Sequence, residues 1–380
     1  MSNIDSKNVA FGFDCCPRAA RRRLYRQHRP KADIPDLILR RRRRSLHLFT
    51  AGLYVSSMQA THFAIVVLIL RLAMQSLPAG AAEAKYFPVQ AGDHPHDVAP
   101  APDGTVWYTG QRTGVLGRLD PKTGGIERIP LGKGSAPHGV IVGPDGAAWL
   151  TDSGQNAIVR VDPISKAVKT WPLPASRAGA NLNTAAFDGK GRIWFTGQTG
   201  IYGRLDTATG TMDVWDAPKG VGPYGITATP SGDIYYVSLA GSFLGKPDME
   251  TGETTVIEPK TENAGTRRVW SDSKGRLWVS EWNVGNLSVY DPALKSWTVQ
   301  RLPDRDPHAY AVYVDDKDKV WVTDFGANAI LSFDPKTKSF QDFPSDKPEA
   351  AVRQLNGRAG EVWGAESGAD RLVVIGATDH

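Results

Sequence analysis

A motif of one aromatic residue followed by a short apolar segment recurs seven times after residue 85, and it constrains the fold more than any other feature. Successive copies begin 41 to 45 residues apart. Most are preceded by a tight turn such as PDG, GKG or PSG, and small-residue turns and further apolar segments follow them. Short alternating apolar runs between Gly and Asp turns indicate β-strands. The copies begin at Trp107, Trp149, Trp194, Tyr235, Trp278, Trp321 and Trp363.

A repeat of roughly 42 residues with this pattern predicts one four-stranded blade. Seven copies therefore predict an all-β, seven-bladed β-propeller around a central channel. The seventh copy ends after the apolar run that starts at Arg371 and lacks an outermost strand. The segment Tyr86–Val89 (YFPV) resembles the outer strand Trp171–Pro174 (WPLP). We expect this N-terminal strand to close the last blade, because pairing the chain ends hides exposed sheet edges.

Residues 1–84 differ in charge from the rest of the chain. They carry 14 Lys+Arg and 5 Asp+Glu, which leaves 31 and 35 of the totals of 45 and 40 for the remainder. The basic block Arg40–Arg44, the apolar run Phe63–Leu70 and the small residues Ala79–Ala84 follow one another in the order of a secretory signal. We predict a disordered basic leader with a signal peptide over 1–84 and the propeller over 85–380. The mature chain would start near Ala82 or Lys85 and be periplasmic or secreted.

Two alternatives for the leader remain open. Met58 is a second candidate start, and an uncleaved membrane anchor could cover Leu48–Leu70. Both cysteines, Cys15 and Cys16, also lie in the leader. The predicted propeller is slightly acidic, which argues against nucleic-acid binding, and we expect a monomer that contacts a membrane only if the leader is retained.

Some repeats carry a more specific signature. Ser135–Pro163 (SAPHGVIVGPDGAAWLTDSGQNAIVRVDP) and Val221–Gly232 (VGPYGITATPSG) resemble the repeats of the streptogramin (virginiamycin B) lyase family, and the similarity spans about residues 86–375. The resemblance implies a lyase that opens cyclic depsipeptides by elimination at the lactone ester, with Mg²⁺ at the channel mouth. Such chemistry uses a base to remove a proton beside a carbonyl and a metal to stabilise the developing negative charge.

The resemblance assigns catalytic roles in the last units. His308 matches a Pro-His-Ala motif in the sixth unit, although by strict spacing Tyr310 occupies that place. Glu366 matches the Glu that ends the seventh aromatic motif. We predict His308, Glu366 and Glu281 as catalytic residues, with Glu281 and Glu366 as Mg²⁺ ligands, since hard cations prefer oxygen. The family's Glu-x-His in the seventh unit is absent, and Arg353 stands at the position of its His.

One polar position recurs at the start of each predicted innermost strand. We expect these side chains to face one channel mouth, together with carboxylates that end the following strands. Predicted substrate contacts are His96, His138, Tyr224, Arg267, Tyr310 and Arg353; Asn183 completes the ring, and the carboxylates are Asp152, Glu281, Asp324 and Glu366. A solvated face of a repeat protein would give the same pattern without any ligand. Arg267, Arg268 and Arg353 suggest an anionic group on the ligand, because Arg pairs with carboxylates bidentately.

Other functions stay open. A non-catalytic periplasmic propeller could bind a ligand or partner protein, and a lactonase of the gluconolactonase type would share the architecture. His94 and His96 could act as an HxH metal pair, because alternate strand residues share a face. The sequence has no Ser nucleophile elbow, phosphate loop, CxxC or HExxH motif.

Overall fold

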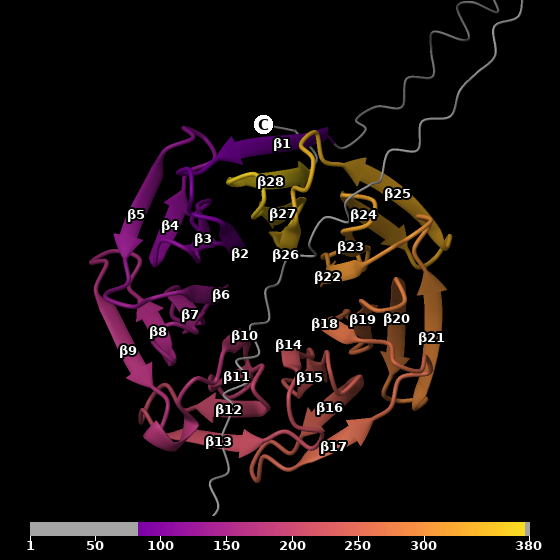
Figure 1. The fold of residues 1–380 in the computed structure, drawn as a ribbon, viewed down its shortest axis with the longest axis horizontal. Helices are drawn as coiled ribbons and strands as arrows, with labels where there is room; N and C mark the ends of the chain where they lie inside the picture. The colour runs from indigo at the N-terminus through magenta and orange to yellow at the C-terminus, as the bar shows by residue number, and fades with distance from the viewer. Residues whose placement is uncertain (1–82, 377–380) are drawn as a thin grey trace, which may run out of the picture. The chain divides into compact units, whose positions relative to one another are not determined.

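The computed structural model describes residues 83–376, and these form seven four-stranded antiparallel sheets arranged as blades around an axis (Figure 1). In six blades the strands follow in chain order from the axis outward. The predicted all-β, seven-bladed propeller is therefore confirmed. The predicted leader and signal segment lie outside the described residues, except for Glu83 and Ala84.

The strands are as follows. Blade 1 contains β2 (Pro95–Pro100), β3 (Val106–Gly110), β4 (Val115–Leu119) and β5 (Ile126–Pro130). Blade 2 contains β6 (Pro137–Val142), β7 (Ala148–Asp152), β8 (Ala157–Val161) and β9 (Val168–Pro172), and the short 3-10 helix η1 (Ala175–Arg177) follows. Blade 3 contains β10 (Leu182–Phe187), β11 (Ile193–Gly197), β12 (Ile201–Leu205) and β13 (Met212–Asp216). Blade 4 contains β14 (Pro223–Ala228), β15 (Ile234–Ser238), β16 (Phe243–Pro247) and β17 (Thr254–Ile257). Blade 5 contains β18 (Thr266–Ser271), β19 (Leu277–Glu281), β20 (Asn286–Asp291) and β21 (Ser296–Arg301). Blade 6 contains β22 (Ala309–Val314), β23 (Val320–Asp324), β24 (Ala329–Asp334) and β25 (Ser339–Pro344). Blade 7 contains β26 (Val352–Arg358), β27 (Glu361–Glu366), β28 (Arg371–Gly376) and the N-terminal strand β1 (Glu83–Pro88).

The last blade is closed by the two ends of the described chain. Strand β1 pairs antiparallel with β28, with Tyr86 opposite Val373 and Phe87 opposite Leu372. Phe87 is buried and stacks on Trp363 with ring centroids 5.4 Å apart. The predicted closure is confirmed, and it starts earlier than expected, because Glu83 and Ala84 already pair with Gly376 and Ile375.

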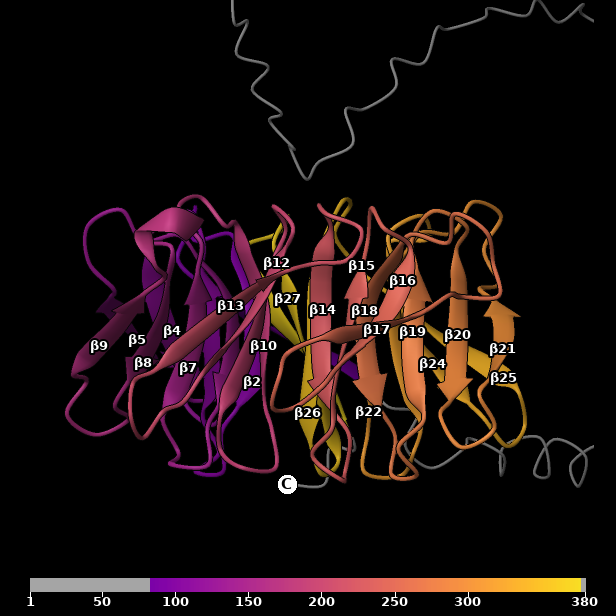
Figure 2. The same cartoon turned by 90° about the horizontal axis from the view of Figure 1, so that it is seen from below.

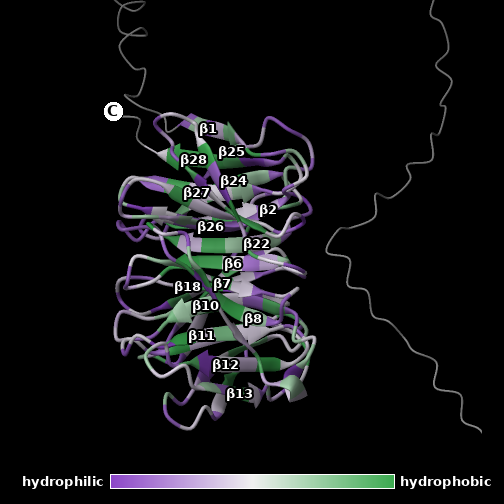
Figure 3. Cartoon of the chain, turned by 90° about the vertical axis from the view of Figure 1, so that its left-hand side faces the viewer, coloured by the Kyte–Doolittle hydropathy of each residue, from purple (hydrophilic) through white to green (hydrophobic). Residues whose placement is uncertain are grey.

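The recurring aromatic residues form the blade cores. All seven lie in the second strand of their blade and are at most 7% exposed. The preceding turn fixes several of them: the indole Nε1–H of Trp194 donates to Asp188 at 2.9 Å, and that of Trp321 donates to Asp315 at 2.9 Å. Hydrophobic residues follow the strands, whereas hydrophilic residues gather in the loops at both faces (Figure 3).

A bulge at the start of each innermost strand shapes the channel. In all seven blades the pairing of the first two strands shifts register after the first residue of the innermost strand. In blade 1, the amide of Asp97 donates to the Thr109 hydroxyl at 3.0 Å, and this hydroxyl donates to the carbonyl of His138 in blade 2 at 2.9 Å. Thr151, Thr196 and Ser280 link blades 2, 3 and 5 to the blade that follows each of them in the same way. The bulges, which re-aim side chains, are thus held in place by the neighbouring blade.

Candidate functional site

The site is built where the seven innermost strands begin, at one face of the ring (Figure 2). The second residue of each innermost strand is the predicted polar position, and we call these seven the mouth ring. All are nearly buried, between 0% and 6% exposed. Its members are His96, His138, Asn183, Tyr224, Arg267, Tyr310 and Arg353.

These side chains contact one another rather than lining an open funnel. The imidazole rings of His96 and His138 lie 3.8 Å apart between centroids, and Asn183 Nδ2 is 3.1 Å from His138 Nε2. The hydroxyls of Tyr224 and Tyr310, from blades 4 and 6, are 2.7 Å apart. The sequence therefore located the ring correctly along the chain, whereas only the structure shows that its members fill the channel at this level.

The third residues of the innermost strands extend the cluster. Asp97 accepts a hydrogen bond from His96 Nδ1 at 2.7 Å, and Arg268 Nη2 lies 3.3 Å from the same carboxylate oxygen. Burial, reinforced by the charges of Arg353 and Arg268, holds the pKa of His96 well below its usual value. Burial also lowers the pKa of His138, and it raises the pKa of Asp97 against the opposing charge of Arg268. Both histidines are therefore neutral near pH 7.

Positive charge exceeds negative charge at this site. The second and third positions of the innermost strands carry three guanidinium groups, those of Arg267, Arg268 and Arg353, against the single carboxylate of Asp97. Arg remains protonated in proteins. The Nε of Arg353 donates to the Ser367 hydroxyl at 2.7 Å. Such a surplus of buried guanidinium charge favours an anionic partner over a cationic one.

Aromatic residues occupy the side of the mouth formed by blades 4 to 6. The residue after the second strand is Leu239, Trp282 or Phe325 in these blades, and we call these three residues the aromatic sector. Each is partly exposed and packs against a cluster that contains Tyr224 and Tyr310. In four other blades the same position is polar: Gln111, Ser153, Gln198 and Ser367. Aligning this one column of the repeat would have revealed the sector, which our sequence analysis missed.

Arg267 joins the aromatic and polar sides. Its guanidinium carbon lies 3.7 Å from the Tyr310 ring centroid and 4.5 Å from that of Trp282. Its Nη2 donates to the Tyr224 hydroxyl at 3.1 Å. The neighbouring phenol groups raise the pKa of Arg267 despite its burial, which opposes the charge. Desolvated cation–π contacts of this kind fix a charge beside an apolar surface.

His308, the predicted base, lies directly before β22 at the edge of this sector. Its imidazole is 5.1 Å from the Trp282 ring and its side chain is 40% exposed. Nε2 lies 4.0 Å from Asp306, and Nδ1 has no hydrogen-bond partner among the described residues. His308 is thus beside the mouth but outside the mouth ring, where Tyr310 takes the blade 6 position.

The predicted carboxylates bind groups of the loops and outer strands. Glu281 accepts hydrogen bonds from Asn286 at 2.9 Å and Ser288 at 2.6 Å, all within blade 5. Glu366 accepts from Ser345 at 2.9 Å and is ion-paired with Arg371. Asp152 and Asp324 accept backbone amides of their neighbouring turns.

These contacts bear on the Mg²⁺ that the family implies. Both oxygens of Glu281 and of Glu366 already accept hydrogen bonds from groups in or beside their own blades, and both side chains are fully buried. The two residues do not fit an open oxygen site for Mg²⁺. The hydrogen bonds and burial of Glu281 and Glu366 therefore do not support their predicted role as Mg²⁺ ligands.

A different group of side chains could hold a metal by distance alone. Ligand atoms of His96, Asp97 and His138 all lie within 4.8 Å of one another. However, Nε2 of His138 is already hydrogen-bonded to Asn183, and the Asp97 carboxylate is hydrogen-bonded to His96 and Arg268, so these atoms are not free to bind a metal. His94, the other half of the HxH pair, precedes β2 and is not part of this group; burial lowers its pKa to about 4.

The fold and the site define a class of protein: a seven-bladed propeller whose polar, arginine-rich mouth lies beside an aromatic sector. The chain belongs to the virginiamycin B lyase family, whose model matches residues 75–300. A streptogramin B lyase structure is 21% identical with a TM-score of 0.71, covering 77% of this chain and 96% of that one. No curated protein sequence matches this chain.

Two further solved structures share the fold. A catalytically inactive virginiamycin B lyase from Staphylococcus aureus with quinupristin is 19% identical, has a TM-score of 0.71, and covers 77% of this chain and 99% of that one. The extracellular domain of a protein assigned to the hybrid two-component systems of B. thetaiotaomicron is 14% identical with a TM-score of 0.63, covering 78% and 43%. Within residues 83–376, no helix is long and apolar enough to cross a membrane.

Proposed function

We propose that this protein is a ligand-binding propeller that holds a small amphipathic molecule at the mouth where the innermost strands begin. One observation carries the proposal: Arg267 contacts the aromatic rings of Trp282 and Tyr310 on one side and belongs to a group of three guanidiniums on the other. A ligand with an apolar part and an acidic or ester group would meet both surfaces at once. Aromatic anchors beside a few convergent polar groups are typical of small-molecule sites.

Elimination at an ester is the second candidate, and family membership favours it. His308 would then remove the proton, since its partly exposed imidazole lies 5.1 Å from the Trp282 ring at the mouth. Three features favour binding without turnover. Arg353 stands where the family has its His and cannot act as a base. Glu281 accepts hydrogen bonds from residues of its own blade, and Glu366 is ion-paired with Arg371. The lactonase alternative would need a metal cage of Glu, Asn and Asp at the channel centre, whereas the second and third positions of the innermost strands here contribute three guanidiniums and the single carboxylate of Asp97.

Turnover and binding of a cyclic streptogramin B separate the two candidates. Purified protein would be assayed with and without Mg²⁺, alongside His308→Ala and Glu366→Gln, and binding would be followed by calorimetry. We expect the parent to bind without opening the ring, and Arg267→Ala to weaken binding about tenfold or more, the effect of losing a charged, desolvated contact. Turnover by the parent that is lost in His308→Ala would establish the lyase instead. Absence of any binding would refute the ligand proposal for this compound class.

Export accompanies this function in our proposal. The secretory-signal order of residues 40–84 supports a periplasmic or secreted location. We also propose that the propeller acts as a monomer on a small-molecule ligand, without nucleic acid.

A further inference from the structure

Several buried hydrogen-bond donors near the mouth have no acceptor among the described residues. The direction of one series of hydrogen bonds explains the first of them, His138 Nδ1. Arg268 Nη1 donates to the Thr184 hydroxyl, so the hydroxyl proton is directed to Asn183 Oδ1 at 2.7 Å. This contact orients the amide and leaves Asn183 Nδ2 to donate to His138 Nε2 at 3.1 Å. Because an imidazole nitrogen that accepts cannot carry the proton, neutral His138 is protonated on Nδ1.

This series of hydrogen bonds therefore ends at His138 Nδ1, a donor for which the described residues offer no acceptor. His138 Nδ1 is buried without a partner among the described residues, and so are Nε of Arg267 and Nε of Arg268. The three residues are 4%, 6% and 4% exposed. Buried donors without acceptors are costly and uncommon in native proteins. Three of them close to one axis indicate an acceptor supplied from outside the chain.

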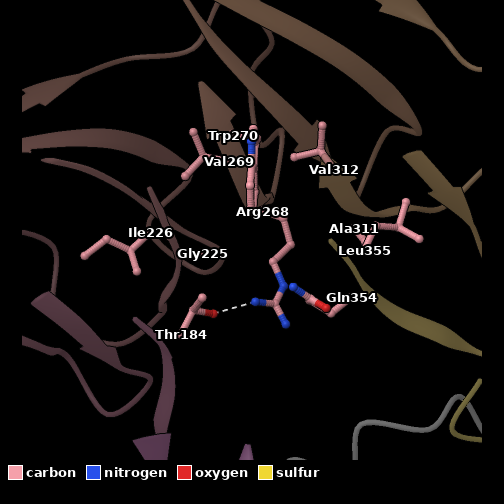
Figure 4. Close-up of a pocket in the computed structure, with 10 residues that line it drawn as sticks. All are labelled: Thr184, Gly225, Ile226, Arg268, Val269, Trp270, Ala311, Val312, Gln354 and Leu355. Carbon is pink, nitrogen blue, oxygen red and sulfur yellow. Dashed lines mark hydrogen bonds between the residues drawn. The ribbon is translucent and has the colours of Figure 1, made fainter. Parts of the chain in front are cut away.

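Space for such an acceptor lies beside Arg268. A cavity of about 20 Å³ is lined by Arg268, Thr184, Gln354 and Ala311, and Figure 4 shows the Arg268 side chain extending into it between Thr184 and Gln354. Gly225 also lines the cavity, and a Cβ there would lie 2.7 Å from the Arg268 Cα. The volume exceeds the roughly 10–15 Å³ that one water molecule needs, so it suits a water molecule or one oxygen of a small carboxylate.

We propose that this axial site binds a small carboxylate through the buried Arg268 guanidinium, whereas the unpartnered donors of His138 and Arg267 belong to the mouth ring and do not line the cavity. The inference rests on the proposed function in one respect: the carboxylate of a mouth ligand would reach Arg268 only by moving mouth-ring side chains apart, whereas a free small acid tests the cavity by itself. Three guanidiniums against one carboxylate disfavour a cation here and favour an anion. A neutral head group of the same shape would leave the donors only partly satisfied.

Formate and formamide test the site, because they have nearly the same size and differ in charge. Each would be titrated at constant ionic strength while the melting temperature and the imidazole ¹⁵N resonances of His138 are recorded. We expect saturable stabilisation by formate and a shift of the Nδ1 resonance, with formamide at least tenfold weaker. Arg268→Gln should weaken formate about tenfold or more. Arg160→Gln, which removes an arginine of β8 that pairs with Asp145 away from the channel, is the matched control and should leave formate binding unchanged.

The outcomes separate this site from the proposed function. N-acetylphenylalanine and its amide add an aromatic part to the same pair of head groups. If the acid binds more tightly than formate, both the axial site and the aromatic sector are supported. If formate binds but the aromatic acid binds no better, the axial site stands and the amphipathic ligand fails. No saturable response to formate in the wild-type protein, or an equal response to formamide, would overturn the axial site even if Arg268→Gln does not fold.

Discussion

The hydroxyl oxygens of Tyr224 and Tyr310 lie 2.7 Å apart, although the two residues are 86 positions apart in the chain. Arg267 donates to the first and stacks on the ring of the second. This contact ties blades 4, 5 and 6 together at the mouth. It also places an aromatic wall beside the guanidinium groups, which is the basis of the proposed amphipathic site.

Substitutions of Tyr310 should separate its hydrogen bond from its packing. Tyr310→Phe removes the hydroxyl and should cost about 1 kcal/mol of unfolding free energy, the net value of a typical hydrogen bond. Tyr310→Ala also removes the ring under Arg267 and should cost about 3–5 kcal/mol. Urea denaturation measures both. Equal losses in the two variants would show that the ring contributes nothing beyond its hydroxyl.

Closure of the last blade should be a main source of stability. Phe87→Ala removes a buried ring stacked on Trp363 and should lower the unfolding free energy by about 3–5 kcal/mol. Val168→Ala, in an outer strand and 38% exposed, is the control and should change it by less than about 0.5 kcal/mol. Deletion of residues 85–90 should have a larger effect still, because it exposes the edge of β28. A deletion protein that melts like the parent would contradict the pairing.

The position of β1 favours one of the two predicted cleavage sites. Cleavage after Ala81 keeps the pairs of Glu83 with Gly376 and of Ala84 with Ile375, whereas cleavage after Ala84 removes both. We therefore expect the exported protein to begin at Ala82. N-terminal sequencing of the protein recovered outside the cytoplasm measures this. A start at Lys85, or an intact Met1 or Met58 terminus on a cytoplasmic protein, would be the contrary result.

Acid should weaken the fold through the buried histidines. The pKa values of His96 and His138 are lowered in the folded state, so near and below pH 6.5 the unfolded chain binds more protons than the folded one. Unfolding free energy therefore falls as the pH drops below 6.5, by up to about 1.4 kcal/mol per pH unit for each imidazole. The raised pKa of Asp97 acts in the opposite direction, at lower pH. The surrounding charges are those of His94, Arg267, Arg268 and Arg353.

Denaturation between pH 7.5 and pH 5 measures this dependence. Replacing both His96 and His138 by Gln should flatten the curve relative to wild type, whatever the variant's stability at pH 7.5. A double variant with the wild-type slope would show that the two imidazoles are not responsible.

Magnesium should leave the stability of the protein unchanged. Glu281 and Glu366 already accept hydrogen bonds with both oxygens, so a bound ion would have to displace Ser288 or Arg371. We expect the melting temperature to shift by less than about 1 °C on adding Mg²⁺ or EDTA, because a ligand stabilises only if it binds the folded state. A clear rise with Mg²⁺ that disappears in Glu366→Gln would restore the metal site that the family resemblance implies.

The sequence by itself determined the seven blades, their closure through residues 86–88, and the positions that begin each innermost strand. These follow from local patterns: a strand alternates every two residues, and a repeat places equivalent residues at the same height around an axis. Thus His96 and Arg353, at opposite ends of the described chain, could be assigned to one ring from spacing alone.

Only the tertiary structure decided what those side chains contact. Whether the channel at Tyr224 and Tyr310 is open depends on the summed volume of side chains from seven blades, which no single repeat encodes. The same limit applies to Glu366, which the sequence presents as a free carboxylate at the mouth. Its partner Arg371 lies on the next strand of the same blade. This ion pair neutralises the Glu366 carboxylate, which is therefore not available to a ligand. Spacing along a chain locates a residue, but burial and hydrogen-bond partners come from neighbours that meet only when the ring closes.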